Sequence, residues 1–444
     1  MAKRDTLKSI SHGLGRRALK TGRIAASVAS AGAKRAVRRS DEDDDAFGEA
    51  LLQQMDEMKG LAMKVGQIVS YMDGVLPERT MEKLRALQQG ATSLEWERIE
   101  PVLEEQLGMP VSEAFDTLDT EPMAAASIGQ VHRGQHDGQP VAVKVQYPYV
   151  RETFTSDLKL LRRFSRLAAL GTAVDGPALA DELKQRFLDE CDYSREARWQ
   201  TAFRDTLRVE GVHIPAVFTE RSADKVLTTE LSRGMPFYDF VEQADRDTRS
   251  RMAARLFEAA FTSIFAHGAL NADPHPGNYL FELEQSDAPE RLVLLDWGCV
   301  RPYSQDFIAT WKRLARTMLD GDRTRFEEVF RATGMVGSRR FDFDVQWAQM
   351  EYLYEPFTVP GFRYDADYIA RSYEFVDPRH NPNLRKLAMP PEWMWTQRLH
   401  WGLNSVLAHM DVDVDWMPLY RRILDKPWEP IRIEPLADAS PTVD

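Results

Sequence analysis

The chain has 444 residues, of which 43% are hydrophobic and 10% aromatic, so it can form a sizeable core and is not an intrinsically disordered protein. Its only cysteines, Cys191 and Cys299, exclude a disulfide framework and a cysteine-based metal cage, and a reducing compartment is the simplest interpretation. The net charge of −12 is distributed unevenly along the chain.

A basic N-terminal segment covers residues 1–45. Residues 1–40 hold 11 lysines or arginines against one acidic residue, a balance of +10, so the rest of the chain carries −22. Such a segment favours an anionic partner, either a lipid surface or nucleic acid. Leu7, Ile10 and Leu14 recur at helical spacing, which fits an amphipathic anchor or an import presequence. A disordered segment that interacts with the acidic run Asp41–Asp45 is the alternative.

No apolar run reaches the roughly 18 residues that a membrane-spanning helix needs. The stretch Leu256–Leu270 comes closest, and Glu258 and His267 within it favour a buried helix. We therefore expect that the chain does not cross a membrane by itself.

Helical periodicity then alternates with short strand patterns. Three helical patterns precede residue 110, the last of them from Trp96 to Leu107, and residues 46–117 are predicted to be a helical extension. The strand patterns surround a small-residue loop and an Asp137-Gly138 turn. The expected elements after them are helices over 151–170 and 178–204, strands over 212–217 and 225–231, and mainly helices from about 236. The predicted fold is α+β, with a small mixed lobe (118–232) followed by a larger helical lobe (233–444).

The small-residue loop has the eight-residue frame of a kinase phosphate-binding loop, in which glycines let backbone N–H groups approach phosphate oxygens. Ala124 and Ala126 occupy the first two glycine positions, and Gly129 the third. Alone, an alanine-rich turn is usually a packing loop. Lys144 follows it at the end of Val-Ala-Val-Lys, in an apolar strand where an unpaired charge is costly. A lysine that contacts the α- and β-phosphates explains this position. The predicted nucleotide-binding residues of this region are Ala124, Ala125, Ala126, Ser127, Gly129, Val131 and Lys144.

A catalytic loop is predicted further along the chain. Asp273 is followed five residues later by Asn278, the kinase spacing that places a carboxylate near the nucleophile and an amide oxygen on magnesium. Asp296 ends an apolar strand and precedes Trp297-Gly298, as a metal ligand would, although a strand-end turn residue has the same pattern. His267 and His275 are interpreted as satisfied loop histidines, because no third soft ligand accompanies them.

These segments resemble the UbiB/AarF (ADCK-type) atypical kinase family over roughly residues 48–302. The motifs that carry the resemblance are Lys64-Val65-Gly66-Gln67, Ala124–Val131, Val141–Lys144, Glu190-Cys191-Asp192, Asp273–Asn278 and Asp296-Trp297-Gly298. The resemblance implies a bilobal protein-kinase-like fold with the helical extension over the cleft. It also implies binding of ATP or ADP with Mg²⁺, and a link to coenzyme Q or other isoprenoid-lipid metabolism. Asn271, where relatives often carry histidine, and Trp297, in place of phenylalanine, depart from the pattern.

The resemblance assigns further roles by position. It makes Lys64, Gly66 and Gln67 regulatory residues that enter the cleft, with Glu190 and Asp192 as their partner segment. Glu196 is the predicted ion-pair partner of Lys144, and Glu190 is the alternative. The segment that would hold the adenine is Glu230-Leu231.

The leading hypothesis is an ATPase or atypical kinase in which Asp273 and Lys144 are catalytic and Asn278 and Asp296 hold the metal. It would support ubiquinone or other isoprenoid-lipid biosynthesis rather than phosphorylate proteins in trans. A nucleotide-gated lipid-binding scaffold and an aminoglycoside- or choline-kinase-like phosphotransferase are the alternatives. The expected partners are an anionic lipid surface, isoprenoid or quinone-precursor lipids and lipid-biosynthesis enzymes, not nucleic acid, and a homodimer is left open. The expected location is the cytoplasmic face of a membrane or, alternatively, the mitochondrial matrix side.

Overall fold

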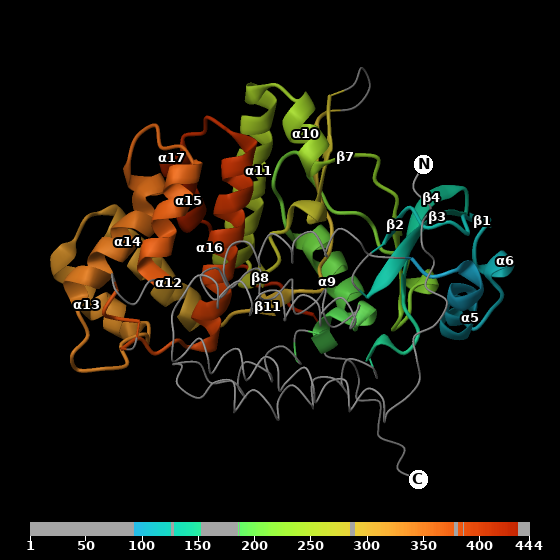
Figure 1. Cartoon of the computed structure of the whole chain (residues 1–444), viewed down its shortest axis with the longest axis horizontal. Helices are drawn as coiled ribbons and strands as arrows, with labels where there is room; N and C mark the ends of the chain where they lie inside the picture. The colour runs from blue at the N-terminus through green and yellow to red at the C-terminus, as the bar shows by residue number, and fades with distance from the viewer. Residues whose placement is uncertain are drawn as a thin grey trace, which may run out of the picture. The chain divides into compact units, whose positions relative to one another are not determined.

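The computed structural model describes residues 93–125, 128–151, 185, 187–284, 289–376, 381–384 and 386–433. The chain divides into two compact units (Figure 1). The first comprises residues up to Ser194 together with Val217–Leu231, and the second comprises Arg195–Ala216 and Ser232 onward. The basic segment and most of the predicted extension, including Lys64, Gly66 and Gln67, lie outside the described residues. The domain boundaries proposed from the sequence remain predictions.

The first unit is built on a five-stranded antiparallel sheet in the order β1-β3-β4-β6, with β2 paired to β3. The strands are β1 (Thr117–Leu118), β2 (Ala124–Ala125), β3 (Gly129–His136), β4 (Gln139–Gln146) and β6 (Val226–Glu230). The turn between β3 and β4 has positive φ at both Asp137 (49°) and Gly138 (72°), which suits the right-handed twist of a two-residue hairpin. The predicted turn is confirmed.

Helix α5 (Trp96–Leu107), followed by α6 (Val111–Ala114) and the short helix η1 (Thr219–Arg221), completes the first unit. Ile99, Val102 and Leu103 of α5 join a buried cluster with the valines of β4. The helix ends at Gly108, whose φ of 69° is the left-handed conformation that glycine adopts without a Cβ penalty. The predicted helix is therefore confirmed, with its apolar stripe on the sheet.

The second unit combines many helices with two small sheets, which join the strands in the orders β5-β10-β9-β7 and β11-β8. The strands are β5 (Val212–His213), β7 (Met235–Pro236), β8 (Ala269–Asn271), β9 (Tyr279–Glu282), β10 (Arg291–Leu294) and β11 (Val300–Pro302). The helices are α9 (Tyr193–Thr206, from its third residue), α10 (Phe237–Gln243), α11 (Arg246–Phe265), η2 (Pro276–Asn278), α12 (Gln305–Leu319), α13 (Arg323–Ala332), α14 (Phe343–Thr358), α15 (Ala366–Ser372), η3 (Tyr373–Val376), α16 (Pro391–Met410) and α17 (Trp416–Leu424).

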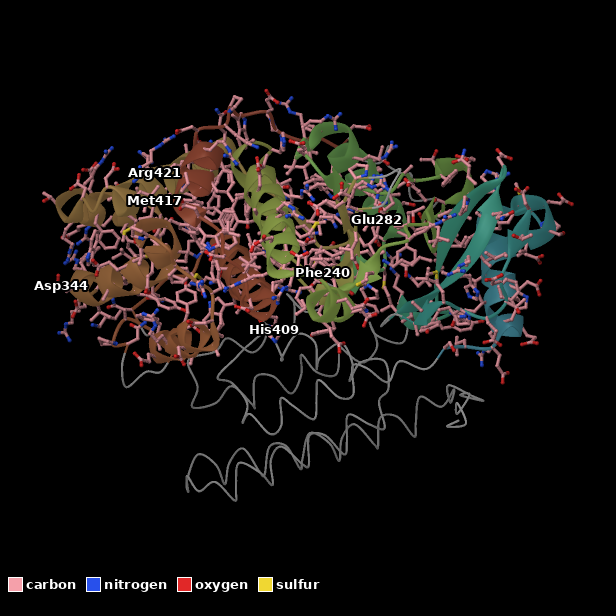
Figure 2. All side chains as sticks on the ribbon, turned by 90° about the horizontal axis from the view of Figure 1, so that it is seen from above. Phe240, Glu282, Asp344, His409, Met417 and Arg421 are labelled. Carbon is pink, nitrogen blue, oxygen red and sulfur yellow. The ribbon has the colours of Figure 1, made fainter. Side chains whose placement is uncertain are left out.

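Helix α11 lies at the centre of this unit and packs against α16 and α17 (Figure 1). Its buried side chains form one continuous core with those of the surrounding helices and strands. Phe240 of α10, labelled in Figure 2, stacks on Phe281 of β9 with ring centroids 3.9 Å apart. Strands β8, β9 and β10 pack into this core, and the predicted catalytic loop connects β8 to β9.

The region after 236 is mainly helical, as predicted, and four short strands, β8 to β11, lie among its helices. Buried residues such as Leu270 and Val300 lie in strands too short to show periodicity. Two other predicted elements need correction. The helix expected over 178–204 is broken, since Cys191 and Asp192 are not helical and α9 begins at Tyr193. The strand expected over 212–217 ends at His213, shortly before Pro215, which has no N–H to donate.

No helix among the described residues is long and apolar enough to span a bilayer.

Candidate active site

The predicted phosphate-binding loop lies at the start of the β2–β3 hairpin in the first unit. Ala124 and Ala125 form the exposed strand β2, whereas Ala126 and Ser127 lie outside the described residues. A Cβ atom at Gly129 would lie 2.3 Å from the carbonyl oxygen of Val145. Gly129 is therefore required by the close approach of β3 and β4, a structural reason that exists independently of any phosphate.

Lys144 lies in β4 opposite Val131 of β3 and Leu227 of β6. Its Nζ lies 4.8 Å from the ring centroid of Tyr193, a buried side chain of the same unit. A cation–π contact of this kind stabilises a partly desolvated ammonium by about 1–2 kcal/mol. Sequence reasoning did not identify Tyr193.

Glu230 ends β6 opposite Val141, and the Leu231 N–H donates a hydrogen bond to the Pro140 carbonyl oxygen (3.1 Å). Glu190 and Asp192 are half-buried where the chain turns into α9. Glu196, on α9, is buried with 3% of its surface exposed. The adenine contact, the partner segment for Lys64 and the Glu196–Lys144 ion pair all remain predictions.

The predicted catalytic loop and the predicted metal-binding turn meet in the second unit. The Asn278 side-chain amide donates to the Asp273 carbonyl oxygen (2.9 Å) and to Asp273 Oδ2 (3.1 Å). The Asn278 carbonyl oxygen accepts from Leu295 N (2.8 Å), directly before Asp296. The structure thus brings the neighbouring predicted residues Asp273 and Asn278 together with the turn that carries Asp296, 18 residues after Asn278 in the sequence.

Asn271 links the same two segments from the other side. Its Nδ2 donates to the Asp296 carbonyl oxygen (2.9 Å), and its Oδ1 accepts from Asp273 N (3.3 Å). Asn271 departs from the expected histidine, yet it connects the predicted catalytic loop to the turn at Asp296 through both the nitrogen and the oxygen of its amide. No sequence signal indicated this role.

Asp296 adopts a left-handed backbone conformation with a φ of 58°. Its Oδ1 accepts a hydrogen bond from Gly298 N (3.1 Å). Aspartate and asparagine tolerate this conformation better than other non-glycine residues, because their short polar side chains bond locally. The turn therefore places a carboxylate at the end of β10 with a defined orientation.

Helix α9 anchors this turn. Arg195 donates hydrogen bonds to the carbonyl oxygens of Gly298 (2.9 Å) and Val300 (2.6 Å). Trp297 is 1% exposed, and its ring lies against Phe203 with centroids 4.3 Å apart. The tryptophan that replaces the expected phenylalanine thus fills the space between the turn and α9.

Asp273 has a cationic neighbour that the motif analysis missed. The Arg398 guanidinium, on α16, lies 2.6 Å from Asp273 Oδ1, and the two side chains are 13% and 25% exposed. Tyr279 lies beside the same loop, and burial, followed by the charge of Asp273, raises its pKa well above the ordinary value of 10. No sequence signal could have placed Arg398 here, because it lies 125 residues from Asp273.

The oxygen donors of the site fit a hard divalent cation. The Asn278 amide nitrogen is engaged by Asp273, so the amide oxygen and the Asp296 carboxylate are the groups that would hold a metal. Carboxylate and amide oxygens suit Mg²⁺. Among the described residues no cluster of three or more histidines, cysteines or acids could hold a metal. His267 hydrogen-bonds the Glu429 carbonyl (2.7 Å) and His275 accepts from Gly277 N (3.0 Å), which agrees with their interpretation as satisfied loop residues.

A cavity of about 40 Å³ lies beneath the catalytic loop, inside the second unit. It is lined mainly by apolar side chains of α11, α16 and the β10 end, together with Asn271, Pro274 and Trp297. The loop therefore does not rest on a fully packed surface.

A protein-family model described as "ABC1 atypical kinase-like domain" matches residues 86–330 of the chain. Among curated relatives, the mitochondrial atypical kinase COQ8 of Saccharomyces cerevisiae is 28% identical over 95% of this chain and 87% of its own length. COQ8B of Rattus norvegicus, also named mitochondrial, is 29% identical over 89% of this chain and 75% of its own. COQ-8 of Caenorhabditis elegans is 32% identical over 63% of this chain, a match that spans 37% of the nematode protein.

Among solved structures, the complex of Rv3197 with erythromycin from Mycobacterium tuberculosis superposes with a TM-score of 0.64. The two sequences are 27% identical, and the match covers 82% of this chain and 92% of the other. Together with the family model, this match confirms the predicted α+β kinase-like fold.

Proposed function

Because the chain belongs to the ABC1 atypical kinase-like family, the UbiB/ADCK group of kinase-like enzymes linked to coenzyme Q biosynthesis, we propose that it is a magnesium-dependent ATPase or atypical kinase. It would bind Mg²⁺ with ATP or ADP and support ubiquinone or other isoprenoid-lipid biosynthesis at a membrane surface.

The observation that supports this proposal best is the hydrogen-bond network of the second unit. Asn271 and Asn278 hold the carboxylate loop at Asp273 against the turn that carries Asp296. Kinase-like phosphoryl transfer depends mainly on positioning and charge stabilisation, so a rigid arrangement of one carboxylate, one amide and one metal-binding acid is what the reaction needs.

In hydrolysis, a bond forms between the water oxygen and the γ-phosphorus while the bond from that phosphorus to the bridging β–γ oxygen breaks. Asp273 would orient the attacking water or hydroxyl, and Asn278 would hold Asp273 in place while directing its own oxygen toward the metal. Lys144 would contribute positive charge to the α- and β-phosphates. When bound, Mg²⁺ would supply charge neutralisation for the phosphate oxygens.

The membrane and lipid partners extend this proposal. The basic segment at residues 1–40 carries a charge suited to anionic lipid headgroups, and its attraction would weaken at higher salt. The proposed location is the cytoplasmic face of a membrane or, because the COQ8 and COQ8B relatives are named mitochondrial proteins, a mitochondrial location. The proposal assigns no acceptor and leaves a homodimer open.

The test is ADP formation by the purified full-length chain, with and without anionic liposomes and a panel of phenolic quinone precursors. We expect magnesium-dependent ADP release that liposomes increase and that Asp273→Asn reduces at least about 100-fold. Release that is equal in wild type and Asp273→Asn would contradict the proposal. If a turnover-deficient variant restores lipid biosynthesis in cells lacking the protein, a nucleotide-gated scaffold replaces it.

A further inference from the structure

Helix α16 contacts the catalytic loop at two consecutive residues. Arg398 pairs with Asp273, and one helical turn later Gly402 lies against Pro274. A Cβ atom at Gly402 would lie 2.4 Å from Pro274 Cγ, so only glycine allows this approach. Because residues i and i+4 share a helix face, one face of α16 holds both residues of the loop.

The position of α16 is itself constrained. Tyr303 donates a hydrogen bond to the Glu392 carbonyl oxygen (3.1 Å), and the Arg301 guanidinium lies 4.5 Å from the Trp395 ring centroid. Leu399 and Leu403 are buried in the core of the second unit. The helix that carries Arg398 is therefore rigidly attached to the strand segment that follows the metal-binding turn.

Apolar packing alone does not hold the loop, because the cavity of about 40 Å³ lies beneath Pro274 and Asn271. Polar contacts to Asp273 add to the packing of Pro274 on Gly402. Asn278 donates to Asp273 Oδ2 and Arg398 donates to Oδ1, so each oxygen of the carboxylate is held by a different side chain.

We infer that Arg398 is a positioning residue of the active site, which holds the Asp273 carboxylate in the orientation that aligns the nucleophile. It acts through Asp273 and does not contact the nucleotide. Arg398 also lies beyond residue 330, where the match to the family model ends. The inference rests on the proposed function, since it assigns a role within ATP turnover.

The experiment measures kcat and KM for MgATP, together with the affinity for MgADP, in the full-length chain and three variants. Arg398→Met removes the guanidinium, Arg398→Lys retains a cation, and Arg371→Met removes a guanidinium that pairs with Glu355 (2.8 Å) elsewhere in the same unit. We expect Arg398→Met to lower kcat about 100-fold, as a misplaced catalytic group does, while KM and MgADP affinity change less than about threefold. Arg398→Lys should have a kcat of at least about a tenth of the wild-type value, and Arg371→Met should retain the wild-type kcat.

The outcomes separate this inference from the proposed function. If Arg398→Met has the wild-type kcat, this inference is overturned and the proposed function stands. The same holds if kcat and MgADP affinity fall by equal factors in that variant. A variant that unfolds is recognised by its thermal transition, and Arg398→Lys then decides. A kcat of at least about a tenth of the wild-type value with unchanged affinity supports a charge-dependent positioning role, and a lower kcat overturns it. If wild type itself releases no more ADP than Asp273→Asn, the proposed function fails and the inference fails with it.

Discussion

Asp296 combines a left-handed backbone conformation with a carboxylate that is proposed to bind the metal, and substitution can separate the two properties. Asparagine keeps the shape and the oxygen that accepts from Gly298 N, and it tolerates a φ of 58° as well as aspartate does. Asp296→Asn should therefore change the free energy of unfolding by less than about 1 kcal/mol. Its loss of charge should lower magnesium-dependent ATP hydrolysis at least about 100-fold.

Alanine at the same position loses both properties. The left-handed conformation costs an ordinary L-residue about 1–2 kcal/mol, and the lost hydrogen bond to Gly298 adds about 1 kcal/mol. Asp296→Ala should thus be destabilised by about 2–3 kcal/mol. Asp296→Gly is the matched control, because glycine adopts positive φ without strain, and it should be more stable than the alanine variant.

The assay pairs urea denaturation, followed by tryptophan fluorescence, with ADP release at several magnesium concentrations. If Asp296→Asn hydrolyses ATP at the wild-type rate, Asp296 is not a metal ligand. If the asparagine and alanine variants unfold at the same urea concentration, the left-handed backbone does not determine the choice of residue.

Three further predictions concern other parts of the chain. Gly129→Ala places a Cβ 2.3 Å from the Val145 carbonyl oxygen, so the substitution should destabilise the protein by about 1–3 kcal/mol and weaken nucleotide binding. A variant with the wild-type urea midpoint and the wild-type nucleotide affinity would contradict this prediction. Burial lowers the pKa of His400 to about 4 from an ordinary 6.5. The unfolded chain therefore takes up the histidine proton at a higher pH than the folded chain does, so the free energy of unfolding falls as the pH is lowered from 6.5 to 4, by a total that approaches about 3 kcal/mol. A His400→Phe variant whose unfolding has the same pH dependence as that of wild type would refute this prediction. Deletion of residues 2–40 should abolish salt-sensitive sedimentation with anionic liposomes, and equal sedimentation before and after deletion would show that this segment is not the anchor.

The sequence patterns predicted those turns and helix ends whose conformation is determined by residues adjacent in the sequence. The Asp137-Gly138 turn and the helix capped by Gly108 follow from conformational preferences of a few adjacent residues, and both are confirmed. The strands β8 and β11 could not be predicted in the same way. Each has three residues, and each exists because it pairs with the other across about 30 residues of chain.

The candidate site was predictable where its residues form a motif. The five-residue spacing from Asp273 to Asn278 and the strand before Asp296 identified the loop and the turn. Arg398, Asn271 and Arg195 were not predictable, since their roles depend on tertiary contacts with backbone or carboxylate groups of other elements.

The most direct test of the central claim is calorimetric titration of ATP into the full-length chain, with and without Mg²⁺, in wild type, Lys144→Met and Asp296→Asn. Magnesium should strengthen binding in wild type, Lys144→Met should weaken binding in both conditions, and Asp296→Asn should remove only the magnesium dependence. Equal ATP affinity in all three proteins would show that these residues do not act on one bound nucleotide, and would contradict the account.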